Sequence, residues 1–419
     1  MFDQSFCEAS ITRMLRKSDF IKLPSLRDEN TKDRAIAEAV ARSRSGFAGV
    51  SFLEKSKLRG KSIYSIPDYS DELVLRKINK NIRKCIGIRE PNRDSITRNL
   101  RSLLSEGVTY RTYRLDIRSF YESFNTPSVI HEVLKIPELS PGTKKLVNEI
   151  LTHYSSNGGL GIPRGLALSA TLSEIMMRSF DEEIKLHPEV FFYSRYVDDI
   201  IIITSKNEEE SDFLKSIKRL LPKGLFLNTQ KTKFFETQSN VKPHKTGELA
   251  PVVLSMEFLG YKIIVSEPEK TTEKSQFRDV HLDIADGKVK KLKTKATRAV
   301  IRYCQDRDFD LLICRLKFLA SNFSVLDADR ERKRLAGIYY NYPLVDPYKS
   351  DSLKVLDQYI KRIALSGHGK IFDDFYSKTT DAQRRQILKV SFCNGFREKT
   401  FLNYSHQKLK KIQECWLYA

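Results

Sequence analysis

The sequence predicts an α+β protein in which a mixed region of strands and helices is followed by an all-α C-terminal third. Two runs, YRTYRLDI from Tyr110 and FFYSRYVDDIIIIT ending at Thr204, are rich in aromatic and β-branched residues, as strands are. Between them, apolar residues recur at helical spacing from Leu166 to Ile184. After Phe309, apolar residues again recur at helical spacing, and no further strand is expected.

These patterns divide the chain into three expected regions. Residues 1–60 are charged and weakly periodic, and we expect an N-terminal extension that is helical in places. Residues 61–275 hold the strands and helices, with a loop or insertion over 237–256, and residues 276–419 form the helical unit. A chain of 419 residues, 40% of them hydrophobic, is long enough for two or three such units.

The charge points to a polyanionic partner. Lys and Arg total 73 against 53 Asp and Glu, which gives a net charge of +20. Cationic surfaces gain affinity for nucleic acids by releasing counterions from phosphates. Two basic segments, Arg76 to Arg101 and Lys288 to Arg302, are candidates for such contacts, and solvated helix faces are the alternative for both.

The cysteine pattern and the hydropathy of the sequence indicate the cellular compartment in which we expect the protein. The six cysteines are scattered and form no CxxC pair, so neither a disulfide framework nor structural zinc is expected. The N-terminus has no apolar signal core, and the β-rich run from Ile200 to Thr204 is far too short to span a membrane. We therefore expect a cytoplasmic protein with no membrane partner.

The chemistry is carried by three acidic residues. Asp198 and Asp199 are adjacent between two apolar runs, which predicts a tight hairpin with the acids at its tip. Asp116 lies at the end of another expected strand. Three such carboxylates can hold two divalent ions roughly 3.5–4 Å apart, the spacing used in phosphoryl transfer. Mg²⁺ is the ion expected, with Mn²⁺ as the alternative. An ordinary Asp-rich turn is the structural alternative for the Asp198–Asp199 pair alone.

Five segments, in order, resemble the palm motifs of reverse transcriptases. LDIRSFYESF is similar to the first carboxylate motif, GLGIPRGLALSATLSEI to the glycine-turn and helix motif, and YVDD to the metal-binding turn. FLNTQKTKF is similar to the lysine motif and EFLGYKI to the primer grip. The resemblance implies a right-hand polymerase fold, with fingers and palm over residues 61–275 and an all-α thumb or helical-repeat domain over 276–419.

The resemblance also implies roles for individual residues. Asp116 and Asp198 would be the direct metal ligands, Asp199 the third catalytic acid, and Lys231 the group that neutralises the departing pyrophosphate, with Lys233 as its rival. Tyr121 would lie under the sugar of the incoming nucleotide and exclude a 2′-hydroxyl. The remaining implied positions are the nucleotide-binding residues Arg164 and Gly165, the primer grip Phe258, Leu259, Gly260 and Tyr261, and a triphosphate clamp at Arg93 or Arg98.

Two departures from the retroelement pattern suggest a subgroup. Arg164 stands where a Gln is usual, and Glu174 stands where relatives tend to have Asn. IPRGLALSATLSE, together with RLKFLASNF and GIYYNYPLV in the last third, is similar to bacterial abortive-infection and defence-associated reverse transcriptases. The opening FDQSF resembles the smaller polymerase of the type-three antiphage system, which uses two reverse transcriptases.

Three functions remain open at the level of sequence. The first is an RNA-directed DNA polymerase in antiphage defence that copies a non-coding RNA into DNA from dNTPs, alone, as a homo-oligomer or with a second reverse transcriptase subunit. The second is protein-primed or template-independent DNA synthesis at the same palm site. The third is an inactive nucleic-acid-binding relic, which retention of all three acids disfavours because like charges in contact are costly.

Overall fold

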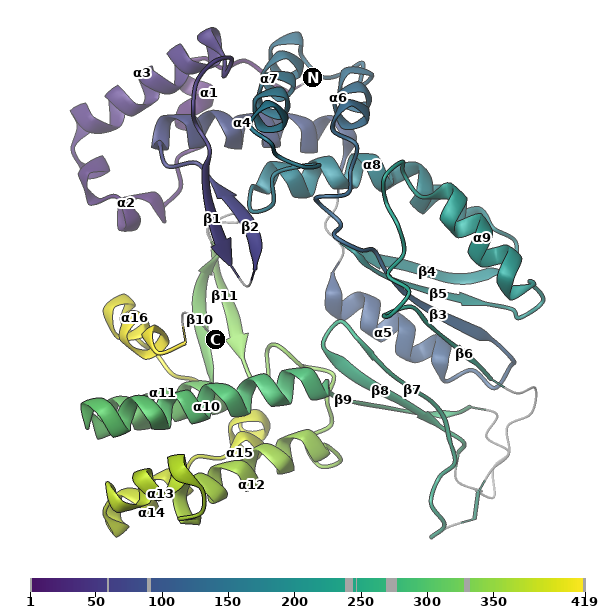
Figure 1. Cartoon of the computed structure of the whole chain (residues 1–419), viewed down its shortest axis with the longest axis vertical. Helices are drawn as coiled ribbons and strands as arrows, with labels where there is room; N and C mark the ends of the chain where they lie inside the picture. Colours follow the sequence, from purple (N-terminus) through teal and green to yellow (C-terminus); the bar gives the residue numbers. More distant parts are fainter. Residues whose placement is uncertain are drawn as a thin grey trace. The chain divides into compact units, whose positions relative to one another are not determined.

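The computed structural model describes residues 2–58, 60–88, 92–237, 244–245, 247–268, 277–327 and 332–416. The chain forms two compact units, each built from two separate stretches (Figure 1). The first unit comprises Met1–Asn92 and Thr109–Gln238, and the second comprises Arg93–Val108 and Ser239–Ala419. The boundaries between these units follow residues 92, 108 and 238, whereas boundaries were expected after residues 60 and 275.

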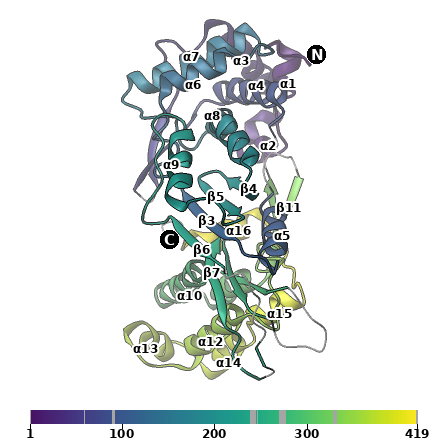
Figure 2. The same ribbon diagram turned by 90° about the vertical axis from the view of Figure 1, so that its right-hand side faces the viewer.

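The first unit contains one four-stranded antiparallel sheet with helices packed against it. The sheet has the order β4-β5-β3-β6. Its strands are β3 (Arg111–Asp116), β4 (Val190–Tyr196), β5 (Asp199–Thr204) and β6 (Lys233–Glu236). Helix α8 (Ala167–Leu186) packs against β4 and against α9 (Glu210–Leu220), and Figure 2 shows both helices beside the sheet. The expected strand–helix–strand order around residues 110–204 is confirmed.

The other elements of this unit precede the sheet or lie between β3 and β4. Five helical segments and one hairpin come first: α1 (Glu8–Thr12), α2 (Asp19–Lys22), η1 (Pro24–Arg27), α3 (Glu29–Ser45), the hairpin β1 (Glu54–Leu58) and β2 (Lys61–Ser65), and α4 (Tyr69–Ile86). Helices α6 (Thr126–Leu134) and α7 (Pro141–Ser156) follow β3. Helix α4 presents Leu73, Ile78 and Ile82 to the core at helical spacing and packs against α3, α7 and α8.

The first 60 residues are part of this unit. Ile11, Phe47 and Phe52 are buried in the same hydrophobic cluster as Leu73 of α4. Asp19 accepts a hydrogen bond of 2.6 Å from the Arg76 guanidinium, and both groups are largely buried. Because a buried ion pair and a shared apolar core hold them, these residues are structurally integral to the first unit.

The second unit combines one helix from early in the chain with everything after residue 238. It contains α5 (Arg93–Leu104) and a three-stranded antiparallel sheet of β7 (Val252–Phe258), β8 (Tyr261–Ser266) and β9 (Asp279–Ile284). The helices that follow are α10 (Asp286–Asp306), α11 (Phe309–Ala320), α12 (Asp351–Leu365), α13 (Lys370–Ser377), α14 (Asp381–Leu388), α15 (Phe392–Arg397) and α16 (His406–Glu414).

The expectation of an all-α C-terminal third was wrong in two places. Strand β9 lies inside it, and a hairpin of β10 (Asn322–Asp327) and β11 (Arg332–Gly337) interrupts the helices. The buried amide of Asn322 donates to the carbonyl oxygens of Gly395 and Thr400 and accepts from the Tyr339 backbone. These bonds to distant residues fix an extended backbone that local spacing did not reveal. The loop expected over 237–256 likewise ends in strand β7.

Candidate active site

The three acids converge at one end of the sheet in the first unit. Asp116 ends β3 and Asp199 begins β5, and the two residues are direct partners in the antiparallel register. Asp198 lies in the two-residue turn that joins β4 to β5. The backbone N–H of Ile117 donates to the Asp198 carbonyl over 3.1 Å, which ties this turn to the end of β3. The expected hairpin with acids at its tip is confirmed.

The turn that presents Asp198 is strained at its first residue. Val197 has a φ of +61°, in the left-handed region that β-branched residues rarely adopt. Such a conformation costs on the order of 1–3 kcal/mol and persists only where the surroundings enforce it. Arg195 helps to enforce it, because its guanidinium donates a 3.1 Å hydrogen bond to the Val197 carbonyl oxygen.

The Asp116 carboxylate is held by two donors. Asn228 donates to one oxygen and the Lys231 ammonium donates to the other, each over 3.0 Å. The backbone N–H of Asn228 also donates to the Asp116 carbonyl oxygen over 2.7 Å. Of the two lysines that the sequence offered, Lys231 reaches the acid, whereas Lys233 lies in β6, with its side chain exposed.

The negative charges of the site favour binding of a cation. Burial raises the pKa of the Asp198 carboxyl, and the nearby Asp116 raises it further. The pKa of Asp199 is raised by burial and then by the adjacent Asp198. Arg114 approaches Asp199 only at 3.9 Å, and Lys231 contacts Asp116 alone among the three acids. Like charges gathered in a half-buried site favour binding of a positive ion.

The donor set fits Mg²⁺ in kind, since carboxylate oxygens are the ligands that this ion prefers. As the side chains lie, however, no group of three or more His, Cys, Asp or Glu residues in the described part of the chain is arranged to hold a metal ion. In this arrangement each oxygen of Asp116 already accepts one hydrogen bond, from Asn228 or from Lys231. The Lys231 ammonium therefore competes with a metal ion for the negative charge of Asp116.

Arg195 was missed at the level of sequence, although it supports the acidic turn. Its buried guanidinium donates to both oxygens of Glu174 and both oxygens of Asp181, two residues of helix α8. Tyr193 donates to Asp181 as well, over 2.5 Å. Glu174 and Asp181 are seven residues apart and so share one helix face. A lone Arg in an aromatic strand, with two acids at this spacing on the preceding helix, is the signal that identifies it.

Tyr121 lies in the loop after β3, close to the acids. Its ring is partly buried, and burial, followed by the negative charge of Asp198, raises the pKa of its hydroxyl. The guanidinium of Arg164 lies over the ring, 5.0 Å from its centroid. The same guanidinium donates two hydrogen bonds to Glu122, of 2.7 and 3.0 Å. The sequence-predicted pair Tyr121 and Arg164 is thus brought together, and Glu122 joins it.

Gly165 makes a close approach to a neighbouring backbone. Its φ is +110°, and a Cβ atom there would lie 2.5 Å from the Tyr64 carbonyl oxygen in strand β2. The N–H of Tyr64 donates to the carbonyl oxygen of Arg164 over 2.7 Å. Gly165 is therefore required for packing of this loop against β2, a contact that the sequence did not predict.

The other expected site residues belong to the second unit. Phe258 and Tyr261 are buried and pair across the β7–β8 hairpin, whose turn residues Leu259 and Gly260 both have positive φ. Arg93 lies over the Tyr261 ring at 5.3 Å and donates to the Asn341 carbonyl oxygen. Arg98 is exposed on α5.

The sequence comparison agrees with this geometry. Residues 73–263 match the family described as reverse transcriptase (RNA-dependent DNA polymerase). The chain contains a reverse transcriptase domain. This domain indicates an RNA-directed DNA polymerase. No curated protein matches the chain.

Several solved telomerase structures are distantly similar to the chain. Apo telomerase from Candida tropicalis, truncated from its C-terminal domain, has a TM-score of 0.33 at 14% identity and covers 55% of this chain and 58% of its own. Two telomerases in complex with a TWJ fragment of telomeric RNA have TM-scores of 0.35. The Candida albicans structure is 12% identical and covers 80% and 61% of the two chains. The Candida tropicalis structure is 14% identical and covers 91% and 67%.

The chain spans about three fifths of the length of the first two telomerase chains. In the described part of the chain, every helix is too short or too polar to cross a lipid bilayer.

Proposed function

We propose that the protein copies a non-coding RNA into DNA during antiphage defence, by adding dNTPs to a 3′-hydroxyl at Asp116, Asp198 and Asp199. The observation that carries this proposal is the register of β3 and β5, which sets Asp116 directly opposite Asp199 with Asp198 in the adjoining turn. The net charge of +20 supports a nucleic-acid partner. The defence role rests on the resemblance of the glycine-turn segment and the opening FDQSF to defence-associated enzymes.

In this proposal the three acids hold two Mg²⁺ ions. When bound, these ions acidify the attacking 3′-hydroxyl and neutralise charge on the leaving pyrophosphate. The strands contribute rigidity: Ile117 and Asn228 fix the backbone of the acids through hydrogen bonds of 3.1 and 2.7 Å. Arg195 donates a hydrogen bond to the Val197 carbonyl oxygen in the turn, so the carboxylate of Asp198 is positioned before substrate binds.

Lys231 has two tasks in this scheme. In the structure its ammonium offsets the charge of Asp116, so it competes there with a metal ion. The side chain is 57% exposed and flexible, so the ammonium can swing toward the triphosphate. There it can donate a proton to, or neutralise, the departing pyrophosphate.

Tyr121 and Arg164 form the proposed floor of the nucleotide site. The guanidinium above the ring and its two bonds to Glu122 limit the movement of the tyrosine. A fixed ring under the sugar leaves no room for a 2′-hydroxyl, which favours dNTPs over NTPs. Arg93 or Arg98 remains the proposed triphosphate clamp, and the β7–β8 turn remains the proposed primer grip.

The decisive experiment is to sequence the nucleic acid that copurifies with the wild-type protein and with Asp198→Asn. We expect one defined RNA in both preparations, and DNA complementary to it in the wild type alone. Asp198→Asn serves as the control, because it keeps the nucleic-acid surface and removes one carboxylate. DNA covalently attached to the protein, with no complementary RNA, would replace this proposal with protein-primed or template-independent synthesis.

A further inference from the structure

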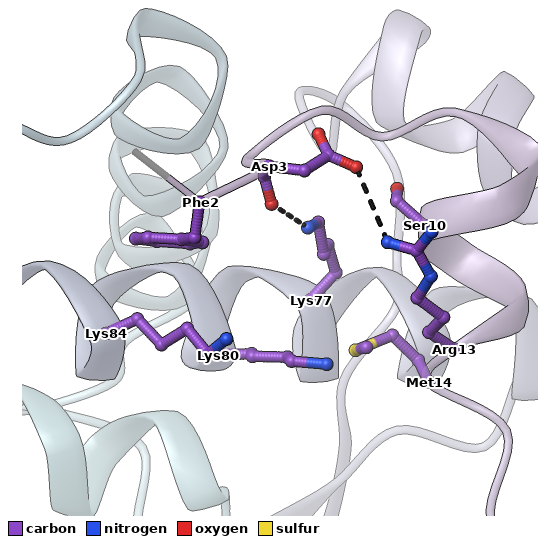
Figure 3. A pocket seen from close by; sticks show the side chains of 8 residues that line it. All are labelled: Phe2, Asp3, Ser10, Arg13, Met14, Lys77, Lys80 and Lys84. Carbon is purple, nitrogen blue, oxygen red and sulfur yellow. Dashed lines mark hydrogen bonds and ion pairs between the residues drawn. The ribbon is translucent and has the colours of Figure 1, made fainter.

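A cavity in the first unit lies beside helices α1 and α4, which carry none of the three acids. Its volume is about 80 Å³. Phe2, Asp3, Ser10, Arg13, Met14, Lys77, Lys80 and Lys84 line it (Figure 3). This volume is enough for several water molecules or for a phosphate-sized group.

The lining is strongly cationic. Lys77, Lys80 and Lys84 recur at three- and four-residue spacing and so project from one face of α4, while Arg13 follows α1. These four cations face one carboxylate, that of Asp3, which Arg13 approaches only at 3.9 Å. Crowding of like charges in a cleft is unfavourable unless an anion offsets it.

The charge of Lys80 is left uncompensated by its surroundings. No ion pair or hydrogen bond joins its ammonium to another described residue. Burial lowers its pKa, and the positive charges of Lys84 and Arg13 lower it further. Lys77 is buried, and its ammonium donates to the Asp3 carbonyl oxygen over 2.7 Å. Its pKa is also lowered, first by burial. An anion in the cavity would relieve both the burial of these charges and their repulsion.

The wall opposite α4 is a fixed segment, the FDQSF motif at residues 2–6. Asn81 of α4 donates to the Gln4 carbonyl oxygen over 3.0 Å, and the Gln4 side chain bonds to the backbone of Glu138 and Ser140. These contacts hold Phe2 and Asp3 over the lysines, and the Lys84 ammonium lies 5.3 Å from the Phe2 ring centroid. The cavity is therefore built by the folded chain and is more than a loose surface gap.

We propose that this cavity is a binding site for a terminal phosphate group, formed by Lys77, Lys80, Lys84 and Arg13 beneath the FDQSF segment. A phosphate monoester carries more charge than a backbone phosphodiester and offers oxygens to several ammonium groups at once. Such a group occurs at the end of a nucleic-acid strand or as free phosphate. The site does not depend on the palm acids, so its failure would leave the proposed polymerase intact.

The test compares one short 3′-labelled RNA with a 5′-phosphate and with a 5′-hydroxyl, by fluorescence anisotropy at fixed ionic strength. EDTA in the buffer keeps metal out of the palm. We expect the wild type to bind the phosphorylated RNA about tenfold more tightly, as one or two charge-assisted hydrogen bonds allow. Lys80→Gln/Lys84→Gln should abolish this difference. The control Lys218→Gln/Lys223→Gln removes the same charge from exposed sites of the same unit and should retain it.

Calorimetric titration of inorganic phosphate forms the second arm. Phosphate binding by the wild type and the control, but not by the Lys80/Lys84 variant, would support the site with free phosphate as its ligand, even if the two RNAs bind equally. Equal affinity for both RNAs, together with no phosphate binding, would overturn the proposal and leave a solvated helix face. The proposal would also be overturned if the control lost the 5′-phosphate preference to the same extent as the variant.

Discussion

The buried guanidinium of Arg195 donates a 2.7 Å hydrogen bond to the carboxylate of Glu174 and a second bond to the carbonyl oxygen of Val197. Glu174 is the helix position at which the sequence departs from the retroelement pattern. The residue at this position therefore has a structural role: the Glu174 carboxylate on α8 is joined, through Arg195, to the turn that carries Asp198.

Replacing Glu174 should loosen this turn. Glu174→Gln leaves Arg195 with Asp181 as its only acidic partner among the described residues, which should lower the free energy of unfolding by about 1–3 kcal/mol. It should also reduce dNTP incorporation, because Asp198 is less well positioned. Thermal unfolding and primer extension measure the two effects. Glu182→Gln on the same helix breaks the exposed Arg178–Glu182 pair and should change stability by less than about 0.5 kcal/mol. Equal effects of the two substitutions would argue against a special role for Glu174.

The acids themselves provide the strongest test of the palm. Asp116→Asn or Asp198→Asn should reduce dNTP incorporation by several orders of magnitude, since each removes a proposed metal ligand. Both variants should remain folded, because each substitution relieves carboxylate repulsion. Circular dichroism monitors folding, and primer extension with Mg²⁺ monitors activity. Near-normal incorporation by either variant would remove that acid from the catalytic set.

Lys231 should have opposite effects on metal binding and on rate. Lys231→Ala removes a positive charge that competes with the ion for Asp116, so the concentration of Mg²⁺ needed for half-maximal activity should fall. The maximal rate should fall roughly 10²–10⁴-fold, the usual contribution of a positioned proton donor. Steady-state incorporation across a Mg²⁺ titration separates the two. Lys233→Ala is the matched control and should change neither quantity. If Lys233→Ala caused the larger loss of rate, the assignment of the two lysines would be reversed.

Tyr121 should control sugar selection. Tyr121→Ala is expected to admit NTPs more readily without faster use of dNTPs, because it removes the ring that we propose lies under the sugar. Tyr121→Phe keeps the ring beneath Arg164 and should keep the preference. The measurement is the ratio of kcat/KM for a dNTP and the matching NTP. An unchanged ratio in the alanine variant would show that Tyr121 is only a core aromatic.

The cations of α10 should contribute to the salt dependence of nucleic-acid binding. Lys293 lies 5.5 Å from the Tyr359 ring and Lys295 lies 5.2 Å from the Trp416 ring, so substituting these two also disturbs packing. Lys288→Gln/Lys290→Gln avoids this problem, since both side chains are exposed. We expect the slope of log affinity against log salt to flatten by up to about one unit per lost phosphate contact, equally for different sequences. The control is Lys361→Gln/Lys389→Gln in the same unit.

An unchanged slope and affinity in the α10 variant would identify these lysines as a solvated helix face. The footprint would then be sought in the basic segment from Arg76 to Arg101. Within that segment, Arg76 is already paired with Asp19 and Glu72, so the exposed Arg98 and Arg101 would be tested first.

The parts of the site that the sequence predicted are those encoded by local pattern. The β-rich runs around Asp116 and Asp198 gave the strands, and adjacent acids between apolar runs gave the turn. The spacing from Leu166 to Ile184 gave α8. Each of these signals lies within about twenty residues, so no knowledge of the tertiary fold was needed.

The features that the sequence did not predict depend on distant contacts. The bond between Asp116 and Lys231 joins residues 115 positions apart, and the position of Arg195 is defined by acids on another element. The β10 strand is fixed by the bonds of Asn322 to residues 395 and 400. The placement of α5 with residues after 238 likewise depends on packing that no local pattern encodes.

The two-stretch construction of the second unit has a consequence for synthesis on the ribosome. Helix α5 and the loop after it are translated before the first unit is complete, yet the Arg278 guanidinium donates to the Glu106 carbonyl oxygen, 172 residues away. At about 5–20 residues per second, that partner emerges on the order of 10–30 s later. During this interval the residues after 238, with which α5 forms the second unit, are not yet made, so they do not cover its apolar face with Ile96, Leu100 and Leu104. A nascent chain stalled near residue 238 would therefore present this face to chaperones, whereas the finished protein buries it.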